Sequence, residues 1–305
     1  KDSLQVVTVN KGYDELELLK EKNICIDNNN IINNYYIYNE ENARVIPLVT
    51  NEKVKTNTYE TSYNYTYDEE GNITTILKDN NEYREYTYSY DNKLVNEKIS
   101  PAIEITYAYD ANNNLSEITK QNVRTSFRYD SYNRLDKIIK DGTVTSFTYD
   151  NMHFYNISKI KTDNETIELK WEGKNLTEYK KDETIKYYYN DEALRIKKEK
   201  KNIKTLYFYD KTNLIKEVTN NKTKEYLYDE NMNLLGFIYD NNKYFYERNV
   251  LGEITKVLDI NGNVVIEYIY DGYGNLLNKD EVLNNTIAKE NPFIYKGYYY
   301  DFDTG

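Results

Sequence analysis

The sequence predicts an all-β fold in which antiparallel β-hairpins repeat along one continuous, curved or spiralling sheet. A motif recurs about every twenty residues, two aromatic residues at its start share one face of a strand, and a turn-forming residue follows them. The clearest copy is YAYDANNNLSEI at 107–118. Similar copies are YTYDEEGNITTI at 65–76, FRYDSYNRLDKI at 127–138 and YLYDENMNLLGF at 226–237.

The second aromatic of each copy marks the period. We place it at Tyr67, Tyr90, Tyr109, Tyr129, Tyr149, Trp171, Tyr189, Tyr209, Tyr228, Tyr246 and Tyr270, with intervals of 18 to 24 residues. Self-similarity with such a period is typical of repeat architectures, in which each unit is one supersecondary element. The 36 tyrosines supply large side chains that favour strands, so the chain is not expected to be disordered.

The turn residues predict that each unit is a β-hairpin. An aspartate after the second aromatic, such as Asp110, can accept hydrogen bonds from backbone N–H groups two residues further on. Three residues after it come glycine or asparagine, which tolerate the positive φ of tight turns. This position holds Gly71, Asn113, Asn133 and Gly274 in four copies.

The return strand of each hairpin carries two apolar residues three positions apart. The first is Ile73, Leu115, Leu135, Leu234 or Leu276, and the second is Ile76, Ile118, Ile138 or Phe237. Residues three apart face opposite sides of a regular strand. The sheet therefore either packs on both faces or contains a β-bulge. A single hairpin is marginal in water, so the hairpins must join edge to edge, and so long a sheet twists and curls.

The chain divides into three predicted parts. Residues 1–62 form an irregular β segment with degenerate repeats, 63–277 hold about eleven hairpins, and 278–305 contain a loop and the start of a further module. Short strands are expected at 4–9, 24–26 and 45–49. Segment 12–22 fits a strand better than a helix, 36–39 resembles a worn repeat, and 51–62 is expected to be a linker or long hairpin loop. A polar loop is expected at 278–290, and an insertion around His153 predicts a projecting loop.

The Tyr-Asp motif, together with the C-terminal sequence, resembles the RHS or YD-repeat family. The repeats cover about 63–275. LGEITKVLDINGNVVIEYIYDGYGNLL at 251–277, followed by NPFIYKGYYYDFDTG at 291–305, is similar to the start of the RHS-associated core. The family includes bacterial polymorphic toxins, wall-associated proteins, the B and C subunits of insecticidal toxin complexes, and teneurins. The resemblance implies a hollow β-shell that can enclose a C-terminal toxin segment.

Self-cleavage through an aspartate near the end of the core is a further implication of the resemblance. We expect that region to lie beyond Gly305, so no catalytic residue is carried over, and Asp301 and Asp303 are assigned to the start of the core. The chain lacks an initiator methionine. We therefore expect it to be a piece of a longer protein whose export signal lies outside it.

Composition disfavours two classes of partner. The net charge of -11 opposes binding to nucleic acid, which rests on cationic contacts with phosphates, and to anionic membrane surfaces. No apolar run reaches the length of a membrane span. The single cysteine, Cys25, lies between isoleucines and is expected to be a small buried apolar residue, because one thiol forms no internal disulfide.

No catalytic, cofactor-binding or metal-binding residue is predicted. One histidine and one cysteine do not supply an ordinary zinc site. The DINGN segment at 259–263 lacks the remaining ligands of a calcium loop and is better explained as an Asn-Gly hairpin turn. His153 is interpreted as a loop residue. The evenly spaced aspartates are interpreted as turn caps: Asp68, Asp91, Asp110, Asp130, Asp150, Asp210, Asp229 and Asp271.

We therefore expect a non-enzymatic structural shell of a bacterial RHS-type protein, secreted or at the cell surface. Its partner would be an enclosed C-terminal toxin segment outside this chain. The alternative is a cell-surface module of a wall-associated protein that binds carbohydrate or protein, because tyrosine faces can stack on sugar rings. Stacking of the tyrosines on one another is the simpler interpretation. A polymer-degrading enzyme would need a catalytic constellation, and the sequence offers none.

Overall fold

The computed structural model describes residues 7–27, 29–39, 47–152 and 154–304. Its 25 strands belong to one sheet, and the strands pair antiparallel with their neighbours in the chain. The predicted all-β fold of hairpin repeats is confirmed. Two compact units are present: unit 1 consists of Lys1–Ala102 with Tyr226–Gly305, and unit 2 is Ile103–Glu225. No helix in the described ranges is long and apolar enough to cross a membrane.

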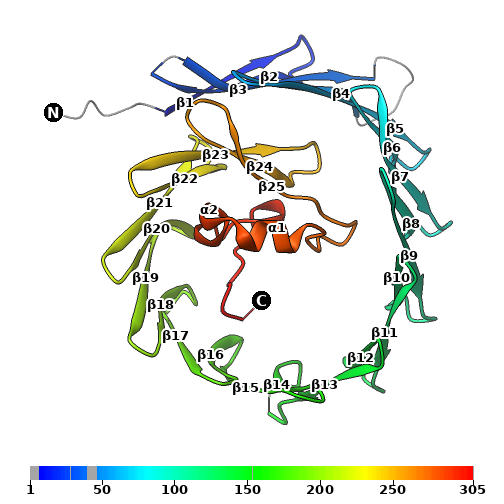
Figure 1. Cartoon of the computed structure of the whole chain (residues 1–305), viewed down its shortest axis with the longest axis vertical. Coiled ribbons are helices and arrows are strands. Elements are labelled where there is room, and N and C mark those ends of the chain that lie inside the picture. Colours follow the sequence, from blue (N-terminus) through cyan, green and yellow to red (C-terminus); the bar gives the residue numbers. More distant parts are fainter. Residues whose placement is uncertain (1–6, 28, 40–46, 153, 305) are drawn as a thin grey trace. The chain divides into compact units, whose positions relative to one another are not determined.

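Unit 1 combines the first strands with the C-terminal segment (Figure 1). Its first strands are β1 (Val7–Tyr13), β2 (Leu19–Ile26), β3 (Asn29–Tyr38), β4 (Val49–Thr56), β5 (Glu60–Tyr67), β6 (Ile73–Lys78), β7 (Asn81–Tyr88) and β8 (Leu94–Ile99). The C-terminal segment holds β22 (Leu234–Tyr239), β23 (Asn242–Arg248), β24 (Ile254–Leu258), β25 (Val264–Glu267), α1 (Lys279–Asn284), α2 (Thr286–Glu290) and the 3-10 turn η1 (Tyr295–Gly297).

Unit 2 consists of hairpin repeats. Its strands are β9 (Ile103–Tyr109), β10 (Leu115–Lys120), β11 (Val123–Tyr129), β12 (Leu135–Lys140), β13 (Thr143–Tyr149), β14 (Ile157–Lys161), β15 (Thr166–Glu172), β16 (Asn175–Lys180), β17 (Thr184–Tyr189), β18 (Arg195–Lys200), β19 (Ile203–Asp210) and β20 (Asn213–Thr219), with β21 (Lys222–Tyr228) at its end. One buried cluster of unit 2 consists of Tyr179, Ile185 and Tyr187.

The turn chemistry predicted for the Tyr-Asp motif is confirmed. Between β9 and β10, Asp110 Oδ1 accepts hydrogen bonds from the backbone N–H groups of Asn112 (2.8 Å) and Asn114 (2.9 Å). The N–H of Asn113 donates to the Asp110 carbonyl over 3.0 Å, and Asn113 has a φ of 68°. Equivalent pairs of bonds to an aspartate oxygen occur at Asp130, Asp229, Asp259 and Asp271.

A β-bulge places both apolar residues of the return strand on one face. In β10, Leu115 lies opposite Tyr109 and Ile118 opposite Tyr107, with a register shift after Leu115 that leaves Ser116 as the extra residue. Because Tyr107 and Tyr109 share a face, Leu115 and Ile118 share it as well. The question that the sequence left open is therefore answered by the bulge, which recurs beside Tyr67, Tyr129, Tyr149 and Tyr189.

In most repeats the second aromatic is hydrogen-bonded to the hairpin before it. The Tyr129 hydroxyl donates to the backbone carbonyl of Leu115 over 2.9 Å. In one repeat the indole N–H of Trp171 replaces the hydroxyl and donates to the Ile157 carbonyl over 2.7 Å. The same hydroxyl-to-carbonyl bond joins Tyr67 to Val49, Tyr88 to Ile73, Tyr149 to Leu135, Tyr189 to Leu176, Tyr209 to Arg195 and Tyr270 to Ile254.

Two of the predicted second aromatics are wrong. Tyr88, and not Tyr90, makes the bond to the preceding hairpin, while Tyr90 is fully exposed in the turn. Arg248, and not Tyr246, occupies the position in β23, and its guanidinium donates to the Leu234 carbonyl over 3.4 Å. With these corrections the intervals narrow to 18 to 22 residues. Counting aromatics misplaced Tyr246 because an arginine holds the position in that repeat. It misplaced Tyr90 because Ser89, and not the aspartate after Tyr90, caps that turn.

Two predictions for the N-terminal region are wrong. Segment 12–22 is neither a strand throughout nor a helix, because a hairpin turn interrupts it after Tyr13. Asp14 Oδ1 accepts from the N–H groups of Leu16 and Leu18, both over 2.9 Å, and Glu17 has a φ of 61°. Segment 51–62 is not a linker, because β4 and β5 pair through most of it. Both regions belong to hairpin repeats in which polar residues replace the aromatic and aliphatic residues of the motif, so the motif could not be recognised in the sequence.

Other N-terminal predictions have mixed outcomes. The worn repeat at 36–39 is confirmed: the Leu48 N–H donates to Asn39 Oδ1 over 2.9 Å, as in the regular turns. The strand expected at 24–26 lies within β2. Residues 7–9 of the first expected strand lie in β1, and Val49 of the third begins β4. Residues 4–6 and 45–46 of those strands lie outside the described residues.

The polar loop expected at 278–290 is wrong, because this segment forms α1 and α2. The helices bury Val282 and Ala288, whose exposed fractions are 3% and 0%, while their polar residues face outward. Asn285 begins α2 by accepting hydrogen bonds from the N–H groups of Ile287 and Ala288. Two apolar anchors in a short polar segment were too few to indicate a helix in the sequence.

The core of unit 1 joins strands that are far apart in the chain. β22–β25, drawn in yellow and orange, lie beside the blue strands β1–β4 in Figure 1. Leu235, Phe245 and Leu258 from the C-terminal strands pack in one buried cluster with residues of β2 to β6. The N-terminal members of this cluster are Ile24, Ile26, Ile31, Ile32, Val54, Tyr63, Tyr65, Ile73 and Ile76.

We predict that Tyr129→Phe lowers the free energy of unfolding by about 1 kcal/mol, because the substitution removes the hydroxyl that donates to the Leu115 carbonyl. Urea unfolding followed by circular dichroism measures the loss. The control is Tyr132→Phe, since Tyr132 is exposed and its hydroxyl makes no hydrogen bond within the described ranges. An equal effect of the two substitutions would contradict a stabilising role for the bond between hairpins.

Candidate functional site

The described residues that were considered as site candidates in the sequence lie in turns or in the core. Asp259 Oδ1 accepts from the N–H groups of Asn261 and Asn263, and Gly262 has a φ of 81°, so the DINGN segment is a hairpin turn. Cys25 is buried and its thiol contacts the Asn30 side chain. Asp301 accepts from the N–H of Asp303 over 3.2 Å. His153 lies outside the described residues.

Side chains that could bind a metal ion do not come together within the described residues. No group of three or more His, Cys, Asp and Glu side chains is placed to hold a metal ion in the parts of the chain that the structure describes. Six of the recurring aspartates cap turns as predicted: Asp68, Asp110, Asp130, Asp150, Asp229 and Asp271. The prediction is wrong for Asp91, because Ser89 takes the cap position and accepts from the Lys93 N–H. It is also wrong for Asp210, which pairs with Asn213 at the end of β19. The even spacing of these aspartates reflects the spacing of the hairpin turns and not a shared reaction centre.

Polar side chains instead gather where the C-terminal strands of unit 1 meet its first strands. Glu247 is 2% exposed, and its carboxylate accepts from Lys256 Nζ (2.8 Å) and from the Tyr59 hydroxyl. At the neighbouring turn the Thr58 hydroxyl donates to the Gly262 carbonyl over 2.6 Å. This buried network joins two segments that neither hairpin turns nor strand pairing connect.

Two further contacts fix the same junction. The backbone N–H of Gly272 donates to Glu97 Oε1 over 2.8 Å. Lys11 Nζ lies 3.2 Å from Asp229 Oδ2 and 3.2 Å from Glu230 Oε1. Because the Glu97 and Asp229 side chains are buried, their contacts lie inside the unit, whereas the Glu230 side chain is an exposed partner of Lys11.

Glu52 is a fully buried carboxyl at this junction. Burial raises its pKa to about 7, and the charge of Glu247 acts in the same direction. Hydrogen bonds from the Tyr65 hydroxyl (2.8 Å), the Asn34 side chain and the Val250 backbone oppose the rise. Glu52 is therefore close to half-ionised near neutral pH.

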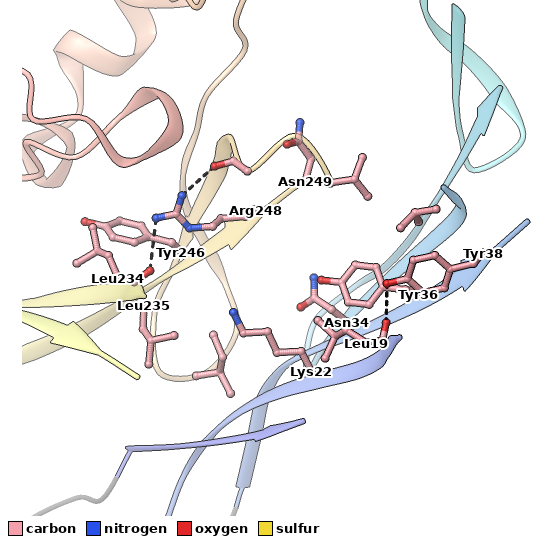
Figure 2. A pocket seen from close by; sticks show the side chains of 14 residues that line it. Leu19, Lys22, Asn34, Tyr36, Tyr38, Leu234, Leu235, Tyr246, Arg248 and Asn249 are labelled. Carbon is pink, nitrogen blue, oxygen red and sulfur yellow. Dashed lines mark hydrogen bonds between the residues drawn. The ribbon is translucent and has the colours of Figure 1, made fainter. Parts of the chain in front are cut away.

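A pocket of about 270 Å³ opens beside this network, between β2–β4 and the β22–β24 segment (Figure 2). Its apolar walls come from Leu19, Ile24, Val49, Leu234, Leu235 and Val250. Figure 2 shows Lys22 reaching from β2 into the pocket, with Asn34 and Tyr36 on one side and Leu235 on the other. Arg248, from β23, also lines the pocket.

The electrostatics of this pocket are set by its two cationic side chains. Burial lowers the pKa of Lys22; Asp229 and Glu230 oppose this, while Lys11 and Arg248 add to it. Burial also lowers the pKa of Arg248. Arg248 donates to the carbonyls of Gly252 (2.8 Å) and Leu234 (3.4 Å), so its guanidinium is committed to the backbone.

A second pocket, of about 470 Å³, lies among aromatic residues of the C-terminal segment of unit 1. Its lining includes Tyr270, Tyr295, Tyr298, Tyr299, Tyr300 and Phe302. Gly274 adjoins it with a φ of 85°, and a Cβ there would meet the Tyr295 ring at 2.6 Å. The ring and the turn therefore pack in direct contact.

Sequence reasoning missed the pocket and the buried carboxyl. Lys22 and Glu52 each come three residues after the aliphatic that opens a return strand, the position that Ile118 holds in the regular copy. A charged residue at that inward position was the available signal. It could be detected only once Leu19 and Val49 were recognised as openers of return strands.

Comparison with protein-family models gives no match. Curated relatives match a short part of the chain. The chain is 36% identical over 83 residues to the tRNA3(Ser)-specific nuclease WapA of Bacillus spizizenii, and 36% identical over 83 residues to the tRNA nuclease WapA of Bacillus subtilis. Each match covers 27% of this chain and 3% of the relative.

Solved structures match nearly the whole chain. The pore form of the Photorhabdus luminescens Tc holotoxin, with a mutation in TccC3, aligns over 96% of this chain and 18% of that one, with 14% identity and a TM-score of 0.53. The crystal structure of TcdB2–TccC3 without its hypervariable C-terminal region aligns over 98% of this chain and 19% of that one, with 13% identity and a TM-score of 0.50. The hairpin-repeat fold is therefore shared with these chains.

Proposed function

Because this chain is an RHS/YD-repeat protein, we propose that it is a non-enzymatic wall segment of a β-shell that helps to enclose or deliver a C-terminal toxin segment. The observation that carries the proposal is the bond that joins the second aromatic of most repeats to the preceding hairpin. A sheet linked in this way is a continuous wall whose side chains are used in packing and in turns.

The arrangement of side chains supports a structural and not a catalytic role. Most of the recurring aspartates cap turns, and most of the second aromatics donate to backbone carbonyls. The relatives named as nucleases match 27% of this chain, so their activity is not assigned to it. The likeness to Tc toxin chains, one solved without its hypervariable C-terminal region, supports a wall beside a variable segment. We place the protein outside the cell or at its surface.

A protease-protection experiment on the full natural protein that contains this chain tests the proposal. If the repeats form a wall, the C-terminal segment resists limited proteolysis while the repeats are folded and becomes cleavable once urea unfolds them. The isolated C-terminal segment is the control. Equal cleavage rates for the enclosed and isolated segments would rule out the wall function.

The second candidate function is a binding module at the cell surface. Exposed tyrosines support it, among them Tyr90, Tyr132 and Tyr155, because tyrosine faces can stack on sugar rings. A glycan array probed with the chain distinguishes the two functions. Glycan binding that is weakened by alanine substitutions at these tyrosines would favour the binding module. An array without signal would favour the wall function.

A further inference from the structure

The pocket between β2–β4 and the β22–β24 segment contains a partly buried ammonium group without a direct counterion. Lys22 lies across from Asn34 in the β2–β3 pair, and its side chain reaches into the pocket. No ion pair of Lys22 occurs within the described ranges. The nearby carboxylates of Asp229 and Glu230 both bond to Lys11. A charge that is partly removed from water in this way is stabilised when a partner of opposite sign joins it.

The other cation of the pocket does not compete for the same partner. The Arg248 guanidinium donates through Nη1 to the Gly252 carbonyl and through Nη2 to the Leu234 carbonyl. It thereby replaces the tyrosine hydroxyl that other repeats use in this position. Its charge adds to the positive potential of the pocket, while Lys22 supplies the uncommitted donors.

We propose that this pocket is a binding site for a small organic monocarboxylate, whose carboxylate pairs with Lys22 and whose apolar body packs against Leu19, Val49 and Val250. A single uncommitted ammonium matches a single negative charge. The apolar walls match a hydrocarbon group better than the hydrated oxygens of phosphate or sulfate. The site is independent of the proposed wall function.

The size of the pocket is consistent with such a ligand. A dry apolar cavity of about 150 Å³ is enough to hold benzene. The 270 Å³ here therefore has room for a branched five-carbon acid such as isovalerate. Binding would also offset the desolvation that lowers the pKa of Lys22, so the amine would become more basic in the complex.

Calorimetric titration of the chain with isovalerate tests the proposal. We expect saturable binding at neutral pH, and at least about tenfold weaker binding of the uncharged analogue 3-methyl-1-butanol, because the charged contact is then missing. Lys22→Met should weaken isovalerate binding by about tenfold or more. Lys20→Met is the matched control, because Lys20 is an exposed lysine of the same strand, and it should leave binding unchanged.

A second variant keeps the test decisive if Lys22→Met perturbs folding. Val250→Phe fills the pocket from the turn and leaves the charge in place, so it too should weaken isovalerate binding by about tenfold or more. Three results would each overturn the proposal: no saturable binding of isovalerate to the wild type, undiminished binding to a folded Lys22→Met variant, or tighter binding of inorganic phosphate than of isovalerate. The first result would identify Lys22 as an ordinary, partly buried lysine without a ligand.

Discussion

Gly236→Ala is expected to lower the free energy of unfolding by about 3 kcal/mol or more. Gly236 lies in β22 opposite Phe245, which is fully buried. A Cβ at residue 236 would lie 1.9 Å from the Tyr244 carbonyl oxygen and 3.0 Å from the Phe245 Cα. Because both atoms belong to the backbone, the clash is relieved only by moving β23 away from the core. Urea unfolding followed by circular dichroism measures the loss.

Gly12→Ala provides the matched control, since Gly12 also lies in a strand, β1. A Cβ there would meet only the Glu21 side chain, at 3.5 Å and beyond, which is ordinary contact. Its effect should stay within about 0.5 kcal/mol, or be slightly stabilising, because alanine restricts the unfolded chain. Similar losses in the two variants would contradict the close approach of β22 and β23.

Glu52→Gln is expected to stabilise the protein by about 3 kcal/mol at pH 8 and to have little effect at pH 4. The pKa of Glu52 is raised from 4.5 to about 7 in the folded protein, chiefly by burial. Below pH 4.5 the carboxyl is neutral in both states. Stability then falls as the pH rises through about 7, because the unfolded chain ionises first. A shift of this size corresponds to about 3 kcal/mol, and glutamine removes it.

The dependence on pH separates Glu52 from the other shifted carboxyls. Hydrogen bonds lower the pKa values of Asp229 and Asp259, so their contributions are lost only as the pH falls below about 4. Urea midpoints measured at pH 5 and pH 8 should therefore diverge in the wild type and converge in Glu52→Gln. Glu60→Gln alters a half-exposed carboxylate and serves as the control. Unchanged pH dependence in Glu52→Gln would contradict the raised pKa.

The local chemistry of the repeat was predictable because it depends on residues close in the sequence. The bonds to Asp110 and the positive φ of Asn113 follow from a single hairpin. The same logic misplaced Tyr90 and Tyr246, since it counted aromatic rings. The second-aromatic position is defined by a hydrogen-bond donor that reaches a backbone carbonyl of the preceding hairpin. The guanidinium of Arg248 meets that requirement as well.

The junction within unit 1 was not predictable from the period. Glu97 and Gly272 are 175 residues apart, and nothing in either local sequence indicates the partner. Gly272 is small enough for this approach, since a Cβ there would lie 2.3 Å from the Leu94 Cδ2 atom. The pocket around Lys22 was not predictable for the same reason, because half of its lining residues come from each end of the chain.

The long-range core of unit 1 has a consequence for synthesis on the ribosome. Tyr59 is synthesised 188 residues before its partner Glu247. Translation proceeds at about 5–20 residues per second, so the two side chains are made about 10–40 seconds apart. During that time Ile32, Val54 and Tyr65 lack the later strands that cover them. The nascent chain therefore exposes an apolar face that a chaperone can bind, and release is timed by the emergence of β22–β24.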